Sequence, residues 1–283
     1  MIQPHERKEP IISAIELTNS GKILGNCSQI LIYSFECLAS TNQTLWELIA
    51  SGVDPGTGVV AAQQTAGRGQ WGHQWHSSVG GLYLSLFLTP HLPATQGLQL
   101  TLATAWGIAQ TFRAAQIPIQ IKWPNDLILN QRKLGGILTE TKVQKKIITQ
   151  AVVGVGINWT NGVPATGINL QSYLETTHPL NMLSLEEVLK LTLIGLVNGC
   201  TNLENQGFQG ILPHYLELLT HQGAEVWVNN QRGRVIGVAL DGRLRVQLFS
   251  RDNQETSEVL LEPGTISLGY QTEQLKLSEN QEI

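Results

Sequence analysis

The sequence predicts an α+β protein in which an antiparallel sheet carries helices on one face and a small all-β unit follows. In the first ~220 residues, strands that succeed one another through short turns predict antiparallel pairing. Apolar residues spaced three and four apart predict helices between the groups of strands. From Gly223 onward the chain changes to short strands split by turns, which indicates a separate barrel. These three observations argue against a regular βαβ repeat.

The first part of the chain holds the elements of the main sheet and its helices. A helix is expected after Ser40, because Ser40 and Gln43 have the spacing of a capping box. Ser184 and Glu187 have the same spacing and predict a second helix start. The other expected elements are strands at 29–36, 58–62 and 80–88, a helix at 98–116, a strand, turn and strand within 119–140, a strand at 146–159, and a helix at about 210–221.

The second part of the chain predicts five short strands within about 50 residues. They lie at 224–228, 232–240, 244–249, 257–261 and 265–268. Asn229-Asn230 and Asp241-Gly242 between them are residues typical of hairpin turns. The expected organisation is a lead-in at 1–26, a main domain at 27–221, a small domain at 222–270 and a polar tail at 271–283.

Composition excludes several classes of protein. The chain has 283 residues, of which 42% are hydrophobic and 14% charged, and its formal net charge is −4. An acidic balance disfavours a dedicated nucleic-acid binder, which usually has a basic excess. No apolar run reaches the ~20 residues that span a bilayer, and the start lacks a signal-peptide core. Three cysteines without CxxC spacing predict free thiols in a reducing compartment, hence a cytoplasmic protein.

A glycine-rich loop from Gly67 to Gly72 contains the first candidate site residues. It matches the dinucleotide pattern G-x-G-x-x-G, but it leads into a strand and lacks the acid expected about 20 residues later. Arg68 is a fixed cation suited to a carboxylate or phosphate, and Trp71 and Trp75 suggest a wall or lid. The alternative is a flexible surface loop with a solvated arginine. His73 and His76 in this segment lack further ligands for zinc.

Polar residues from Lys122 to Asp126 lie between aliphatic runs. A buried lysine or aspartate is costly unless it is paired or binds a ligand. Two interpretations remain open: Lys122 pairs with Asp126 across a turn, or the lysine faces a phosphate and the carboxylate helps to hold Mg²⁺.

Glycines within two expected strands indicate close approach of a ligand or of another backbone. Gly135 and Gly136 follow Arg132-Lys133, and Gly154 and Gly156 precede Asn158. Adjacent bases at a hairpin are often only solvated turn residues. Together with the Gly-Arg-Gly loop, however, the two strands predict a site for a flat apolar ligand that carries an anionic group.

Five motifs in this order resemble those of biotin protein ligases over roughly residues 29–270. They are Ser40-Thr41-Asn42, QTAGRGQWGHQW at 64–75, KWPNDL at 122–127, KLGGIL at 133–138 and GVGIN at 154–158. The resemblance implies a catalytic domain like that of class II aminoacyl-tRNA synthetases, at 27–221, and a small C-terminal SH3-like β-barrel. It also implies that biotin and Mg·ATP form biotinyl-5′-adenylate, whose acyl group passes to a lysine of the biotin carboxyl carrier protein of acetyl-CoA carboxylase.

The resemblance also implies roles for individual residues. Arg68 and Lys133 would neutralise the biotin carboxylate and the α-phosphate, which repel each other, and Lys122 would assist. Asp126 would hold Mg²⁺ or position Lys122. The implied biotin-binding residues are Ser40, Thr41, Asn42, Gln64, Arg68, Gly69, Gln70, Lys133 and Gly136. The implied ATP-binding residues are Arg68, Trp71, Asn125, Asn158 and Trp159.

The sequence departs from the family pattern in the glycine-rich loop. Gln70, Trp71 and His73 stand where basic residues are common, and the hypothesis is that Trp71 closes the loop by packing. Only 39 residues precede Ser40, fewer than the about 60 of a helix-turn-helix DNA reader, so a ligase without repressor function is expected.

Two alternative functions stay open at this point. A lipoate or octanoate ligase is the alternative enzyme, and a non-catalytic protein that binds biotinyl-adenylate is the alternative from another class. The expected partner is the carrier protein, with no nucleic acid and no membrane, and the chain would be a monomer or a homodimer.

Overall fold

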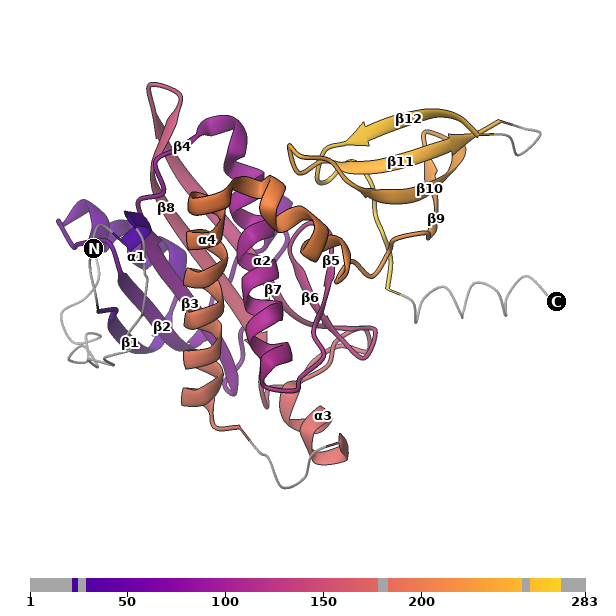
Figure 1. Cartoon of the computed structure of the whole chain (residues 1–283). Coiled ribbons are helices and arrows are strands. Elements are labelled where there is room, and N and C mark those ends of the chain that lie inside the picture. Colours follow the sequence, from indigo (N-terminus) through magenta and orange to yellow (C-terminus); the bar gives the residue numbers. More distant parts are fainter. Residues whose placement is uncertain (1–21, 25–28, 178–182, 251–254, 271–283) are drawn as a thin grey trace.

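A computed structural model describes residues 22–24, 29–177, 183–250 and 255–270 (Figure 1). Its helices are α1 (Thr41–Ala50), α2 (Gly97–Ala114), α3 (Leu170–Thr177) and α4 (Leu185–Leu216), with short 3₁₀ turns at Lys22–Leu24, Gln70–Gly72 and Ala94–Gln96. The first sheet contains β1 (Leu31–Leu38), β2 (Thr57–Gln64), β3 (Gly81–Leu88), β4 (Leu92–Pro93), β5 (Gln120–Lys122), β6 (Asp126–Leu129), β7 (Arg132–Gln144) and β8 (Ile147–Asn158). The second contains β9 (Glu225–Val228), β10 (Gln231–Val238), β11 (Leu244–Phe249) and β12 (Glu255–Leu261).

The first sheet is mixed, whereas the sequence predicted antiparallel pairing. Its strands run in the order β1-β2-β3-β8-β7-β6-β5, and β4 pairs with one end of β8. All neighbours are antiparallel except β1 and β2. The expectation of antiparallel pairing is wrong for that pair, because α1 lies between the two strands in the chain and a helical crossover returns the chain in parallel.

Helices lie on both faces of this sheet, whereas the sequence predicted only one covered face. α2 and α4 pack together over one face (Figure 1), and their apolar residues share a core with Val153 and Val155 of β8. α1 belongs to a second cluster, in which Leu45 and Leu48 pack with Val152. Since neighbouring residues of a strand point to opposite faces, α1 covers the face opposite to α2 and α4.

Two helix predictions need correction. α1 begins where expected, but Ser40 makes no capping hydrogen bond; the backbone N–H of Thr41 donates instead to Oε1 of Gln64, at 2.8 Å. The 210–221 helix is the end of α4, which breaks at Gly207 (φ +66°) and stops at Leu216. The capping box of Ser184 and Glu187 is confirmed at the start of α4.

The run expected as one strand before residue 130 is a hairpin. β5 and β6 pair antiparallel, with Lys122 opposite Asp126. Part of the expected lead-in also belongs to the fold, because Ile23 and Leu24 are fully buried in the main core. The other lead-in residues before Lys22 and the tail from 271 lie outside the described residues.

The C-terminal unit is a four-stranded antiparallel sheet in the order β12-β11-β10-β9. The fifth strand expected at 265–268 is wrong: this segment has no strand structure. Leu268 instead packs in the main hydrophobic core, with Ile266 against it, so the chain returns from the second sheet to the first (Figure 1). The proposed boundary at His221-Gln222 lies between α4 and β9. Among the described helices, none has the length and apolar character needed to cross a membrane.

Candidate active site

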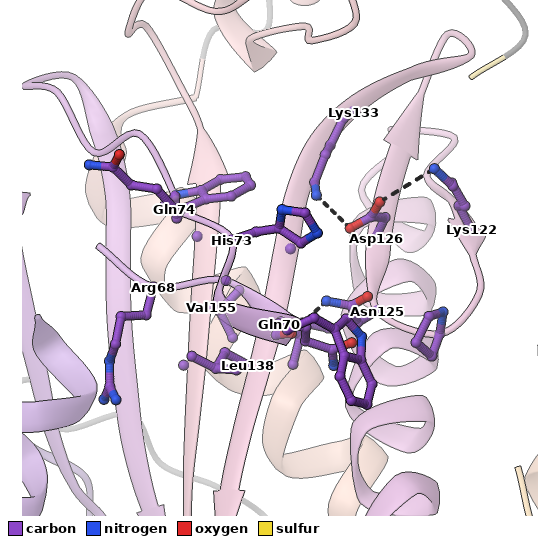
Figure 2. Close-up of a pocket in the computed structure, with 18 of the residues that line it drawn as sticks. Arg68, Gln70, His73, Gln74, Lys122, Asn125, Asp126, Lys133, Leu138 and Val155 are labelled. Atoms are coloured by element: carbon purple, nitrogen blue, oxygen red, sulfur yellow. Dashed lines mark hydrogen bonds and ion pairs between the residues drawn. The ribbon is translucent and has the colours of Figure 1, made fainter. Parts of the chain in front are cut away.

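A cavity of about 620 Å³ lies where the motifs meet, within the usual range for small-molecule sites. It is lined by the start of α1, the glycine-rich loop, the β5–β6 turn, β7, β8 and the segment after β12 (Figure 2). The cavity lies on the α1 face of the sheet, because Gly154 and Gly156 of β8 alternate with Val153, Val155 and Ile157 of the main core, and Gly136 of β7 pairs with Gly156.

The cavity brings together most of the residues that the sequence predicted. The predicted residues that line it are Ser40, Thr41, Asn42, Gln64, Arg68, Gly69, Gln70, Trp71, Lys122, Asn125, Asp126, Lys133 and Gly136. Asn158 and Trp159 are not in the lining. Asn158 accepts a hydrogen bond from Asn161, and the indole N–H of Trp159 donates to the carbonyl of Leu183, so both side chains bond to neighbouring loops in this structure.

One end of the cavity is a buried polar network around the start of α1. The Thr41 hydroxyl donates to Oε1 of Gln64, at 3.2 Å, and the Ser85 hydroxyl lies 2.8 Å from that of Thr41 and 2.6 Å from Oδ1 of Asn42. The amide of Gln64 in turn donates to Ser77. Because these side chains are tied to one another, their donors and acceptors have fixed directions. Ser85 and Ser77 were not among the predicted residues.

The two glycines of β8 make room for protein side chains. A Cβ on Gly154 would lie 2.3 Å from Oδ1 of Asn42, and a Cβ on Gly156 would lie 2.5 Å from Nε1 of Trp75. At Gly136 of β7, by contrast, the nearest atom would be 3.5 Å away, which is ordinary contact. The glycines of β8 therefore seat Asn42 and Trp75, and Gly136 borders open space in the cavity.

Trp75 forms a wall of the cavity, as the loop composition suggested. The ammonium of Lys133 lies 5.2 Å from the centre of a Trp75 ring, within cation–π range. The indole N–H of Trp75 is buried and has no hydrogen-bond partner among the described residues. A buried donor without a partner is costly, and this N–H lies against Gly156 of β8.

Arg68 is bound by a carboxylate that the sequence prediction missed. Its guanidinium makes two contacts with Glu140 of β7: Nη1–Oε1 at 3.1 Å and Nη2–Oε2 at 3.2 Å. Glu140 also accepts from the amide of Asn42 and the indole of Trp46. In Figure 2 the Arg68 side chain points away from Lys133 and Asp126. The alternation of β7 could have predicted that Glu140 lies on the cavity face, because Gly136, Leu138 and Glu140 share one face of the strand.

A second ionic cluster surrounds Asp126 (Figure 2). Its Oδ1 lies 2.7 Å from the ammonium of Lys133, and its Oδ2 lies 3.9 Å from that of Lys122. Oδ2 also accepts a hydrogen bond of 2.7 Å from the hydroxyl of Tyr270. The predicted Lys122–Asp126 pair therefore exists, but the shorter ion pair is with Lys133.

The segment after β12 adds two contacts that no sequence motif indicated. Trp71 in the glycine-rich loop lies against Gly264, where a Cβ would be 3.0 Å from the indole. Trp71 has a left-handed backbone (φ +58°) and remains 66% exposed. Tyr270 reaches Asp126 from the end of the same segment. Residues beyond the second sheet thus complete the cavity of the first.

Titratable groups near the cavity include His221, which is buried between α4 and β9. Burial lowers the pKa of His221, and the charge of Lys122 lowers it further. Hydrogen bonds to the backbone of Gly269 and Leu268 and the charge of Asp126 act in the opposite direction, but they do not offset the lowering.

Cys200 is fully buried, and burial raises the pKa of its thiol to about 12, which is consistent with a core residue rather than a nucleophile.

Metal ligands are few at this site. Within the described ranges, no group of three or more His, Cys, Asp or Glu side chains could hold a metal ion. Asp126 is the one carboxylate among the described residues that line the cavity. His73 lines the cavity and His76 does not.

A family model and individual relatives point to the same protein family. Residues 34–158 match the model of the "Biotin/lipoate A/B protein ligase family". The chain is 30% identical over 203 residues to a biotin--[acetyl-CoA-carboxylase] ligase of Paracoccus denitrificans, covering 67% of this chain and 82% of the relative. It is 43% identical over 132 residues to the bifunctional ligase/repressor BirA of Bacillus subtilis, covering 46% of this chain and 40% of the relative. The chain therefore spans less than half the length of such bifunctional relatives.

A solved structure resembles the fold of both sheets. The biotin protein ligase of Aquifex aeolicus, in complex with biotin and ATP, superposes with a TM-score of 0.66 at 25% identity. The match covers 83% of this chain and 97% of that one. Because the likeness extends over nearly the whole of the solved chain, it includes more than the 34–158 segment.

Proposed function

We propose that this chain, a member of the biotin protein ligase family, activates biotin with ATP and transfers it to a lysine of a biotin carboxyl carrier protein. The observation that carries the proposal is one cavity that joins a fixed polar network to two cations. Those cations, Arg68 and Lys133, are paired with Glu140 and Asp126 respectively. Two cations flanking an apolar slot are what the joining of two anions needs.

The polar end of the cavity suits the ureido ring of biotin. A ureido group needs acceptors for its N–H groups and donors for its carbonyl. We assign this role to Ser40, Thr41, Asn42 and Gln64, which line this end of the cavity. The apolar side chains at the cavity wall would pack on the valeryl chain, and Gly136 leaves room beside it.

The two cations suit the first chemical step. A carboxylate oxygen of biotin attacks the α-phosphorus of ATP, the bond to the β-phosphate breaks, and pyrophosphate leaves with its electrons. Arg68 and Lys133 offset the repulsion between the carboxylate and the α-phosphate and the charge that builds on the phosphoryl oxygens. Arg68 is paired with Glu140 and Lys133 with Asp126, so an anion that binds Arg68 competes with Glu140. Gly69 and Gln70 of the glycine-rich loop also line the cavity, and we assign them to the binding of biotin.

The second step needs no protein nucleophile. The ε-amine of the carrier lysine attacks the carbonyl carbon of the mixed anhydride, the bond to the phosphate oxygen breaks, and AMP leaves. The amine loses a proton as the amide forms. The glycine-rich loop keeps water from the anhydride until the lysine arrives, and Trp71 closes it against Gly264.

The nucleotide would lie towards the β5–β6 turn and the segment after β12. We assign it to Lys122, Asn125 and Trp71, which line the cavity there, and to Asn158 and Trp159, which reach it only if the nearby loop rearranges. Mg²⁺ arrives as part of Mg·ATP, chiefly held by the phosphates. Both oxygens of Asp126 have protein partners, so we propose that Asp126 orients the lysines in preference to binding the metal.

Transfer of label to a carrier tests the proposal. The chain is incubated with Mg·ATP, a biotin carboxyl carrier domain and labelled biotin, with a carrier whose target lysine is replaced by arginine as the control. The expected result is ATP-dependent label on the first carrier alone. Label retained only by the chain would instead identify a protein that sequesters the adenylate. Transfer from lipoate or octanoate but not biotin would identify the alternative ligase.

A further inference from the structure

Tyr270 stands at the end of the described chain and at the edge of the proposed ATP-binding region. It follows Leu268, which is 6% exposed and packs in the main core. Leu268 also lines the cavity beside residues of the first sheet, so the segment lies against that sheet two residues before Tyr270. The Tyr270 side chain then lines the cavity and contacts two of its charged residues.

The hydroxyl of Tyr270 fixes the carboxylate of Asp126. It donates to Oδ2 at 2.7 Å, while Oδ1 receives the ammonium of Lys133 at 2.7 Å. Hydrogen bonds to an ionised acceptor are stronger than those between neutral groups. Because each oxygen has a short partner on its own side, the carboxylate plane has one preferred orientation. That orientation in turn fixes the position of the Lys133 ammonium.

The ring of Tyr270 supports the second lysine. The ammonium of Lys122 lies 3.7 Å from the ring centre, well within cation–π range. Its distance to Oδ2 of Asp126 is 3.9 Å, which is longer than a hydrogen bond. One phenol side chain therefore contacts both the carboxylate and the cation beside it.

We infer that Tyr270 is a positioning residue for the activation step, an inference that rests on the proposed function. Through its hydroxyl it acts on Lys133 by way of Asp126, and through its ring it acts on Lys122. The arrangement presents two lysines and one carboxylate to the nucleotide, a net positive charge suited to phosphates. We expect the effect on the KM for ATP and on kcat, because Tyr270 contacts Asp126 and Lys122 at the edge of the region proposed for the nucleotide.

Two substitutions separate the hydroxyl from the ring. Tyr270→Phe keeps the ring beside Lys122 and removes the bond to Asp126, and Tyr270→Leu removes both. The assay is biotin-dependent ATP–pyrophosphate exchange, with thermal unfolding as a check on the fold. Tyr173→Phe, the same chemical change on α3 outside the cavity lining, is the matched control and should behave like the unchanged protein.

The expected results differ between the two variants. Tyr270→Phe should lower kcat about tenfold, the effect of one hydrogen bond to a charged group, with the KM for biotin unchanged. Tyr270→Leu should lower kcat further and raise the KM for ATP, since Lys122 also loses its support. In an Asp126→Asn background the effect of Tyr270→Phe should largely disappear, because residues that act through one another are not additive.

Three outcomes would overturn the inference. They are a Tyr270→Phe variant with unchanged kcat, a loss that appears in the KM for biotin instead, and an undiminished tenfold effect in the Asp126→Asn background. A failure of the proposed function looks different. In that case the unchanged protein itself shows no biotin-dependent exchange, before any variant is compared.

Discussion

Arg68 and Glu140 form a two-contact ion pair that links the glycine-rich loop to β7, 72 positions apart in the sequence. The loop cation proposed to meet the biotin carboxylate is thus already paired with an anion of the protein. Glu140 accepts in addition from Asn42 and Trp46, so its carboxylate is held in place. Binding of an anionic ligand by Arg68 must compete with this pair.

Replacing Glu140 by glutamine should therefore strengthen the binding of biotin. The change keeps an acceptor oxygen for Asn42 but removes the negative charge that competes for Arg68. A partly exposed ion pair contributes up to about 1 kcal/mol, so the Kd should fall by up to about fivefold in equilibrium dialysis with labelled biotin.

Biotinamide provides the control for this prediction, because it has no carboxylate. Its Kd should be nearly the same for the Glu140→Gln variant and the unchanged protein. Weaker binding of biotin by the variant, or an equal gain for biotinamide, would show that Glu140 does not compete with the ligand for Arg68.

The glycines of β7 and β8 should differ in what they tolerate. Gly154→Ala places a methyl 2.3 Å from Oδ1 of Asn42, and such overpacking costs about 1–3 kcal/mol of unfolding free energy. Gly136→Ala meets its nearest atom at 3.5 Å and should change stability by less than about 0.5 kcal/mol, while its methyl narrows the cavity. Urea unfolding of both variants measures the difference, and equal stability of the two would contradict the assigned roles.

Trp71→Ala should shorten the retention of biotinyl-adenylate without unfolding the protein. The indole is mostly exposed and contacts Gly264, and loss of about 1–2 kcal/mol of packing corresponds to roughly tenfold faster release. Rapid gel filtration of the labelled complex measures the release rate. Trp227→Ala, a similarly exposed tryptophan on β9 outside the cavity lining, is the control. Equal retention by both variants would exclude the packing role.

His221 should make the fold less stable in mild acid. Burial, and then Lys122, lowers the pKa of His221 below its ordinary value of 6.5. The folded protein therefore favours the neutral ring, and the unfolded chain takes up the proton first as pH falls. The contribution of neutral His221 to the free energy of unfolding is fully present above about pH 6.5. It is lost as pH falls through the lowered pKa.

The measurement is the urea midpoint at pH 8 and at pH 5 for the unchanged protein and for His221→Gln. The glutamine keeps a polar side chain but cannot titrate, so its decline between the two pH values should be smaller. An equally steep decline in the variant would assign the acid sensitivity to other groups.

The sequence predicted the site through residues that lie close together in short motifs. Gly-Arg-Gly, Lys122 to Asp126 and the glycine-spaced strands each placed cavity residues correctly, because two-residue periodicity decides which side chains share a sheet face. Short motifs could not predict that Gly154 and Gly156 make room for protein side chains. Their neighbours, Asn42 and Trp75, come from other parts of the chain, and such proximity arises only from the packed fold.

Long-range partners account for what the sequence left out. Glu140 bonds to Arg68 and Tyr270 to Asp126, across 72 and 144 positions, and neither partner stands in a motif of its own. The parallel pairing of β1 and β2 was missed for a related reason, since turn spacing reports only on local connections. The segment 265–268 has the composition of a strand, but tertiary packing of Leu268 in the main core overrides that preference.

Biotin-dependent ATP–pyrophosphate exchange by Lys133→Ala tests most directly whether cations in this cavity join the two acids. Lys190→Ala, an exposed lysine paired with Glu186 on α4, is the matched control. The account predicts that the unchanged protein and the control exchange pyrophosphate, and that Lys133→Ala loses about 10²–10³-fold in kcat while remaining folded. A folded Lys133→Ala variant that exchanges pyrophosphate as fast as the control would contradict it.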